Sequence, residues 1–250
     1  MEQERVHRLK IATIIFKSTS DDLLFWVLID TLFLTAVRGF TATEVSLAFT
    51  VSFWVALLFK RFAYESIKRM RVGKSIVFSA VLFLAAAVLI TFGPTLPFVI
   101  AGQCLYEIAP DFYDVSAILM RDICDRDKKG RDFVRSSALA STMYSVITLV
   151  TALLIDPLMN ANPFLPMIIC IVSRVFSLVL AVVIHVRTKD VSWLAHKRRV
   201  VHKGKLVSRS TANFMLMAAM FGAFCSLPIS YLKLLLQDNL AAVYDEDWEL

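Results

Sequence analysis

Residues 60–92 contain the two features that decide the fold of this chain, KRFAYESIKRMRVGK followed by SIVFSAVLFLAAAVLITF. The first part, residues 60–74, holds six Lys and Arg residues, and the second part, residues 75–92, holds no charged residue. A helix of about 20 apolar residues crosses the ~30 Å hydrocarbon core of a bilayer. The segment therefore predicts a membrane-spanning helix that begins beside a basic connection.

The same alternation of basic clusters and apolar stretches recurs along the whole chain. Of the 27 Lys and Arg residues, 24 lie in four clusters, at residues 5–17, 60–74, 121–135 and 187–209. Short connections rich in Lys and Arg stay on the cytoplasmic side of a membrane. We therefore expect all four clusters, and with them the N-terminus, to be cytoplasmic.

The composition excludes several classes of protein. Hydrophobic residues make up 58% of the 250 residues, and the mean hydropathy is +0.66, which is more than a soluble domain of this length needs. The Lys and Arg residues that give the net charge of +6 lie beside apolar spans, where anionic lipid head groups supply the counter-charge. Nucleic-acid binding is therefore not expected. The sequence shows no nucleophile beside a base, no phosphate-binding glycine loop and no metal-ligand spacing. We expect a membrane protein that is not an enzyme and holds no cofactor or metal.

The apolar stretches predict seven membrane-spanning helices, with short outer turns that contain Gly and Pro. The predicted spans are residues 11–37, 43–59, 75–92, 98–120, 136–155, 164–186 and 210–236. This pattern predicts three parts: a six-helix bundle at 1–186, a basic cytoplasmic linker at 187–209, and a seventh span with an acidic outer tail at 210–250.

A short motif and the order of the spans together resemble a known family. The connection after the second span carries Arg71, Gly73 and Lys74, which match three of the six positions of a motif with glycine, acidic and basic residues. The other three positions hold Ser66, Met70 and Ser75. Segments FWVLIDTLFL (25–34) and LYEIAPDF (105–112) are also similar to bacterial members of that family. In motif and topology the chain resembles the amino-terminal half of a major facilitator superfamily transporter, plus its seventh helix.

Acidic residues inside the fourth predicted span form one stripe. Gln103, Glu107, Asp111 and Asp114 follow one another at steps of four, four and three residues, so they share one helical face. Carboxyl groups inside a membrane seldom face lipid. We interpret the stripe as the lining of a pathway, either a proton relay or a site for a cationic or hydroxyl-bearing substrate. The alternative is that Asp114 lies near the cytoplasmic surface, with only Glu107 and Asp111 deep.

The first and sixth spans add further charges. A first span starting at residue 23 would be too short to cross, which places Asp22 at or inside the inner membrane edge, with Asp30 as its partner in the pathway. Asp21 points away from Asp30 and is either a helix cap or a surface carboxylate, or part of the same group. Arg174 lies halfway along the sixth span and needs a buried anion, and Glu107 or Asp111 are the expected partners in a structural ion pair.

The resemblance implies a secondary active transporter in the plasma membrane, which crosses it several times. In that family the first and fourth helices face the central pathway, so the acids would carry protons and bind a small-molecule substrate. The transporters are built from two six-helix halves. The alternative is therefore a truncated, non-transporting fragment or a membrane interaction protein, and either case implies self-association or a missing second half.

Overall fold

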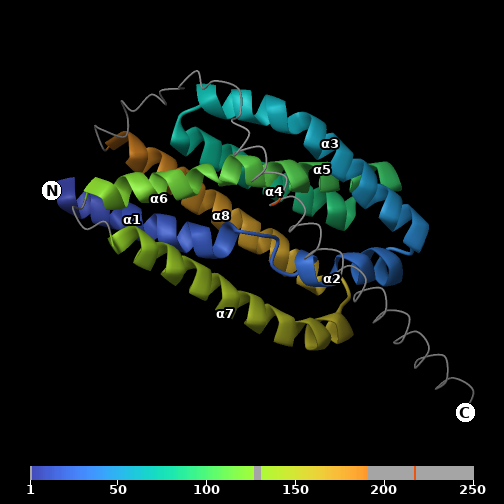
Figure 1. The fold of residues 1–250 in the computed structure, drawn as a ribbon. Coiled ribbons are helices and arrows are strands. Elements are labelled where there is room, and N and C mark those ends of the chain that lie inside the picture. The colour runs from blue at the N-terminus through green and yellow to red at the C-terminus, as the bar shows by residue number, and fades with distance from the viewer. Residues whose placement is uncertain (1, 127–130, 191–216, 218–250) are drawn as a thin grey trace, which may run out of the picture. The chain divides into compact units, whose positions relative to one another are not determined.

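The computed structural model describes residues 2–126 and 131–190, together with Met217 (Figure 1). In these ranges the chain is helical and contains no strand. The chain divides into two compact units, Met1–Arg199 and Val200–Leu250. The predicted seventh span at 210–236 and most of the predicted linker lie outside the described residues, so the fold below is that of the first unit.

Nine helical segments account for the six spans predicted in the first unit. Four of them, α3, α4, α7 and α8, include stretches that are long and apolar enough to cross a membrane. The other two predicted spans are each divided between shorter helices. The segments are α1 (Glu2–Ser20), α2 (Trp26–Leu32), the π-helical η1 (Phe33–Val37), α3 (Ala42–Arg69), α4 (Val72–Phe92), α5 (Leu96–Tyr113), α6 (Val115–Arg126), α7 (Arg131–Ala161) and α8 (Leu165–Asp190).

The prediction of one continuous helix over residues 11–37 is wrong, because α1 ends at Ser20 and α2 begins only at Trp26. The hydroxyls of Ser18 and Thr19 both bond back to the carbonyl of Ile15 at 2.9 Å. The carboxylate of Asp22 accepts from the Leu23 amide at 2.8 Å. Short polar side chains that bond to nearby backbone compete with the helix, so this polar run interrupts it.

The fourth predicted span is interrupted as well, at the junction of α5 and α6 beside Asp114. Pro110 lies inside α5 and cannot donate a helical hydrogen bond. Two buried serines of α4 bond to carbonyls in this last turn of α5: Ser79 to Ala109 at 3.0 Å and Ser75 to Phe112 at 3.1 Å. A neighbouring helix thus satisfies backbone groups where the fourth span is distorted.

Two helices run further than the apolar pattern predicts. The α3 helix begins at Ala42 after a capping box between Thr41 and Glu44, and it ends at Arg69 instead of residue 59. The α7 helix continues through Pro157 to Ala161, although residues 156–163 were expected to form an outer loop. In α3 the apolar stretch ends before the helix does, because Lys and Arg are good helix formers.

Close packing between helices depends on small residues at the contact. The α4 helix packs against both α5 and α8, and α1 packs against α7 and α8. A Cβ atom at Gly102 of α5 would lie 2.8 Å from Cγ1 of Ile90 in α4. A Cβ atom at Gly73 of α4 would lie 2.7 Å from Nδ1 of His185 in α8. Both glycines let two helix backbones approach closely, as in other membrane bundles.

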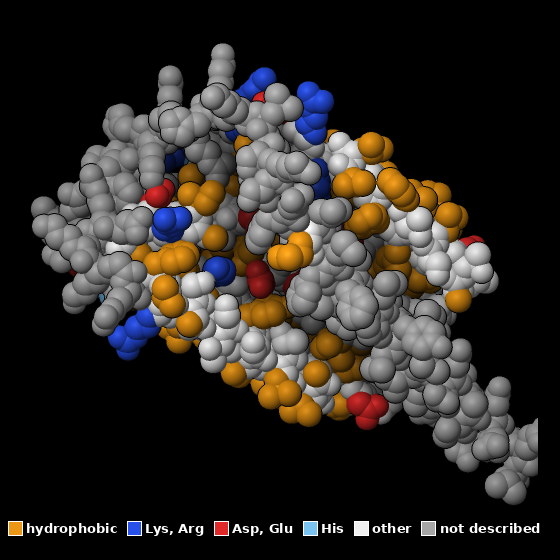
Figure 2. Space-filling model, in the orientation of Figure 1, with side chains coloured by type: hydrophobic (Ala, Val, Ile, Leu, Met, Phe, Trp, Pro, Cys, Tyr) orange, Lys and Arg blue, Asp and Glu red, His pale blue; other side chains and the backbone are white. Residues whose placement is uncertain are grey.

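The outer surface of the first unit is strongly apolar. Leu58 of α3, Leu153 of α7 and Val172 of α8 are exposed by 79%, 71% and 63%. Figure 2 shows hydrophobic side chains across much of the visible face. Large exposed apolar patches mark surfaces that contact a membrane or another protein. The four apolar helices and this surface indicate a membrane protein.

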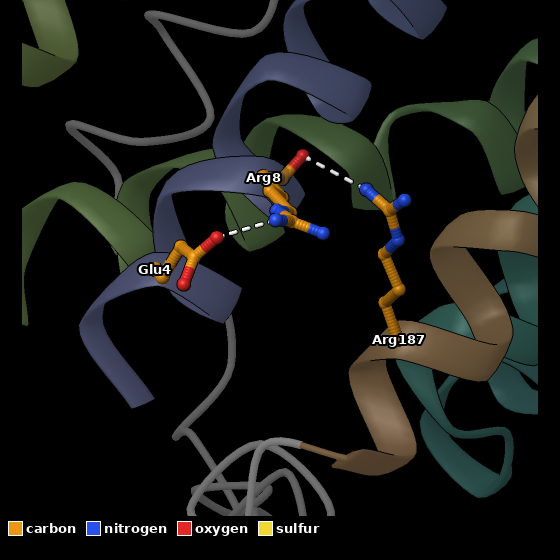
Figure 3. A network of polar contacts seen from close by, with 3 residues as sticks. All are labelled: Glu4, Arg8 and Arg187. Atoms are coloured by element: carbon orange, nitrogen blue, oxygen red, sulfur yellow. Dashed lines mark hydrogen bonds and ion pairs between the residues drawn. The ribbon is translucent and has the colours of Figure 1, made fainter. Parts of the chain in front are cut away.

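Basic residues from distant parts of the chain gather at one end of the unit. Arg187 of α8 donates to the carbonyl of Arg8 in α1 at 3.3 Å, and Arg8 pairs with Glu4 (Figure 3). Gly73 at the start of α4 lies against His185 near the end of α8. The basic clusters at residues 5–17 and 60–74 and the start of the one at 187–209 therefore share one end of the unit, as the helical topology requires.

Candidate functional site

The interruption of the first span brings Asp22 to the acidic stripe of α5. The Oδ1 atom of the half-buried Asp22 accepts from the Leu23 amide at 2.8 Å and from the Tyr106 hydroxyl at 2.5 Å. This second bond joins residues 84 positions apart in the sequence. Because α1 ends before Asp22, the Asp22 carboxylate can reach Tyr106 of α5.

Tyr106 is the centre of this group. Its hydroxyl donates to Asp22 of the first predicted span, and Glu107, the next residue in the chain, belongs to the acidic stripe. Gln103, one turn away on α5, is 4% exposed and donates through Nε2 to Oε1 of Glu107 at 3.2 Å. The structure therefore brings Asp22 to the part of α5 that carries Gln103 and Glu107, while the carboxylate of Asp30 accepts from the Thr31 amide at 2.6 Å.

Sequence reasoning did not single out Tyr106. Its hydroxyl was the available signal, since a tyrosine within an apolar span needs a polar partner for its O–H group. It also directly precedes Glu107 in the chain. Tyr144 of α7 was also missed, since its single hydroxyl lies in an apolar segment. The charges of Asp22 and Arg174 act on it.

The other two acids of the stripe form a second group nearer the basic end. Asp111 is half-buried and Asp114 is exposed, and the charge of Lys60 from α3 acts on both. Lys17 of α1 also acts on Asp114, and its own side chain reaches Ser137 of α7 at 3.5 Å. Lys60 and Lys17 belong to the predicted basic clusters, yet both influence the acidic stripe.

Arg174 has different partners from those expected. Its guanidinium donates through Nη1 to the Ser20 carbonyl at 3.3 Å and through Nη2 to the Thr19 carbonyl at 3.4 Å. It is 1% exposed and lies over the Phe83 ring at 5.1 Å. The hydrogen bonds of Arg174 thus go to backbone carbonyls, and an ion pair with Glu107 or Asp111 is not among the salt bridges of the described residues. Depth along a helix could not reveal this, because the broken end of α1 offers acceptors that a continuous helix would lack.

Polar residues of α7 extend the same face. Ser141 and Ser145 are exposed, and the Ser145 hydroxyl bonds to the carbonyl of Ser141 in its own helix at 3.0 Å. Figure 2 shows a few acidic and basic side chains beside hydrophobic ones near the middle of the visible face.

The residues of the family-like motif have a structural position. Arg71 is the residue that precedes α4, and Lys74 and Ser75 donate their amides to its carbonyl at 3.0 and 3.1 Å. Gly73 packs against His185, and the charges of Arg71 and Lys74 act on that histidine. These three residues join α4 to α8 at the basic end, away from Tyr106.

The described ranges, 2–126 and 131–190, contain no cluster of three or more His, Cys, Asp or Glu side chains that could hold a metal ion. Comparisons of this chain with protein-family models, with curated proteins and with solved structures find no match.

Proposed function

We propose that the chain is a secondary active transporter of the major facilitator type, located in the plasma membrane, whose pathway runs along the acidic face of α5. The observation that carries this proposal is the hydrogen bond between Tyr106 and Asp22. It joins a broken first span to an acidic stripe on the fourth span. Interrupted helices with polar groups at mid-membrane are typical of transport sites.

The proposed coupling ion is the proton. Glu107 accepts from Gln103, and in the described part of the chain no Lys or Arg forms a salt bridge with Glu107 or Asp111. A carboxylate in a membrane interior without a paired cation is costly, and taking up a proton removes its charge. Glu107 and Asp111 are therefore the acids that we assign to proton movement, with Asp22 and Asp30 beside them.

A second function, a membrane interaction protein or a non-transporting fragment, is favoured by one observation. Asp21, Asp114, Ser141 and Ser145 are exposed in the first unit, although they lie within or beside apolar spans. Polar groups of this kind seldom face lipid. In this alternative their function is to bind another polypeptide, either a second copy or a separate second half.

Proton flux in reconstituted vesicles tests the proposal. The purified chain is inserted into vesicles that contain a pH-sensitive dye, and sugars, amino acids, organic cations and organic acids are added in turn. We expect one class to move protons with the wild-type chain, and we expect Glu107→Gln to stop proton-driven accumulation while substrate exchange continues.

Glu65→Gln is the matched control for this experiment. Glu65 belongs to α3, is exposed and pairs with Lys68 at 3.2 Å, so its loss removes one carboxylate without touching the pathway. Accumulation by Glu107→Gln at the level of Glu65→Gln and the wild type would refute proton movement through Glu107. Failure of every class of solute to move protons would favour the interaction protein.

A further inference from the structure

The broken first span leaves the carboxyl end of α1 inside the unit. The last carbonyls of a helix have no partner within that helix, and in a membrane no water is present to take their place. Ser20 is 2% exposed, so its carbonyl cannot rely on solvent. Helix carboxyl ends also carry partial negative charge. The end of α1 therefore needs a buried donor with positive charge.

The carboxyl group of Asp22 lies two residues beyond this end. Its Oδ1 atom is held by the Leu23 amide and the Tyr106 hydroxyl. The carbonyls of Thr19 and Ser20 and the carboxylate of Asp22 together form a place for a cation. In some transporters, unwound carbonyls and the carboxyl ends of half-helices hold an inorganic cation.

Here the positive charge comes from the chain itself. Arg174 donates to the Thr19 and Ser20 carbonyls at 3.4 and 3.3 Å, and it is the cation whose charge acts on Asp22. The Phe83 ring lies 5.1 Å from the guanidinium carbon and adds a cation–π contact. A planar guanidinium can donate to two acceptors at once, which a compact ammonium does less well.

We propose that Arg174 is a built-in cation that takes the place of an inorganic ion at the broken end of α1, and that by fixing this end it sets the chain direction that brings Asp22 to Tyr106. It is a positioning residue, since it acts on the candidate site through the end of α1. This inference concerns the assembly of the site and holds whether or not the chain transports a solute. It also leaves the α1 carbonyls unavailable for sodium, which agrees with the proton as coupling ion.

Three substitutions separate charge from packing: Arg174→Lys, Arg174→Met and Arg174→Ala. Methionine retains most of the buried apolar volume but has no charge. Lysine retains the charge but lacks the planar guanidinium that donates to two acceptors at once. In mild detergent we expect Arg174→Met to lower the midpoint of thermal unfolding by roughly 6–12 °C, and Arg174→Lys to lower it less. We expect low millimolar guanidinium to restore part of the midpoint of Arg174→Ala, because the free ion fits the vacated place.

Two control variants match this series. Arg187→Ala removes an arginine of the same helix that also donates to an α1 carbonyl, at 3.3 Å, but at the partly exposed basic end (Figure 3). Ser177→Ala removes a buried α8 hydroxyl that has no hydrogen-bond partner in the structure. We expect both midpoints to stay near that of the wild type.

A labelling experiment reads the position of the α1 end directly. In a chain whose native cysteines are replaced by alanine, Ser20→Cys should react slowly with a maleimide, because Ser20 is buried. We expect Arg174→Met to raise the reaction rate several-fold, and Arg187→Ala to leave it unchanged. Neither measurement needs a substrate, so a failure of the proposed transport function would not affect them.

Three results would overturn the inference. The first is an Arg174→Met variant with a wild-type midpoint and a slow Ser20→Cys reaction, which would show that the charge is dispensable. The second is equal rescue of Arg174→Ala by guanidinium and by sodium chloride at matched ionic strength, which would indicate simple screening. The third, which applies if Arg174→Ala does not fold, is an Arg174→Lys variant that is no more stable than Arg174→Met.

Discussion

Replacing Tyr106 by phenylalanine removes the hydroxyl that joins α5 to the break in the first span. The ring and its apolar contacts remain. Asp22 loses the shorter of its two hydrogen bonds and keeps the bond from the Leu23 amide at 2.8 Å. Hydrogen bonds to charged groups contribute about 1.5–3 kcal/mol. Hydrogen bonds between membrane helices average only about 0.6 kcal/mol.

We expect the effect of Tyr106→Phe to fall in the higher range, at about 1.5–3 kcal/mol, because the acceptor is a carboxylate with few other donors. The free energy of unfolding is measured by denaturant titration in mixed micelles. The control is Tyr64→Phe, since Tyr64 is 59% exposed and lies on the outer surface of α3. That variant should stay within about 0.5 kcal/mol of the wild type.

A double-mutant cycle with Asp22→Asn tests whether the two residues act together. If the hydrogen bond carries the effect, the two single changes should be non-additive by at least about 1 kcal/mol. A Tyr106→Phe variant as stable as Tyr64→Phe, or additive effects in the cycle, would refute the assignment of this bond as the link between the spans.

Three further predictions concern topology, packing and assembly. A cysteine introduced at Lys68 should be protected from an impermeant thiol reagent in intact cells and one at Asn160 should be labelled; the opposite result would invert the predicted orientation. Gly102→Ala should lower the free energy of unfolding by about 1–3 kcal/mol, because its methyl group would lie 2.8 Å from Ile90, whereas an unchanged value would mean that α4 and α5 can separate at no cost. The purified chain should self-associate or be degraded rapidly, because one unit leaves polar groups exposed; a stable, monodisperse monomer by light scattering would contradict this.

The sequence predicted the helices that are apolar along their whole length better than those that carry polar runs. For α4, the prediction of residues 75–92 differs from Val72–Phe92 only at its start. The breaks at Asp21 and Asp114 were missed because an average over a long window conceals a few polar residues. Local signals were present in the Ser18–Asp22 run and in Pro110, whose effects on backbone hydrogen bonds are short in range.

The acidic stripe was predicted from spacing alone, since spacing fixes which residues share a face of one helix. The partners across helices were not, because they depend on rotation and on distortions that spacing does not contain. Arg174 shows this best: it is buried, and its acceptors exist only because α1 ends at Ser20. Tyr106 escaped notice because a single hydroxyl has no periodic pattern.

The length of α3 makes the unit sensitive to bilayer thickness. Its 28 residues extend about 42 Å, whereas the hydrocarbon core is about 30 Å thick. Lys60 lies about 27 Å along the helix from its first residue, a distance close to the thickness of that core. In a thicker bilayer its ammonium group would have to reach further for water, or turn towards Asp111 and Asp114. Lipids of graded acyl-chain length would therefore change how close Lys60 lies to these acids. We expect the midpoint of thermal unfolding to be highest at one intermediate chain length.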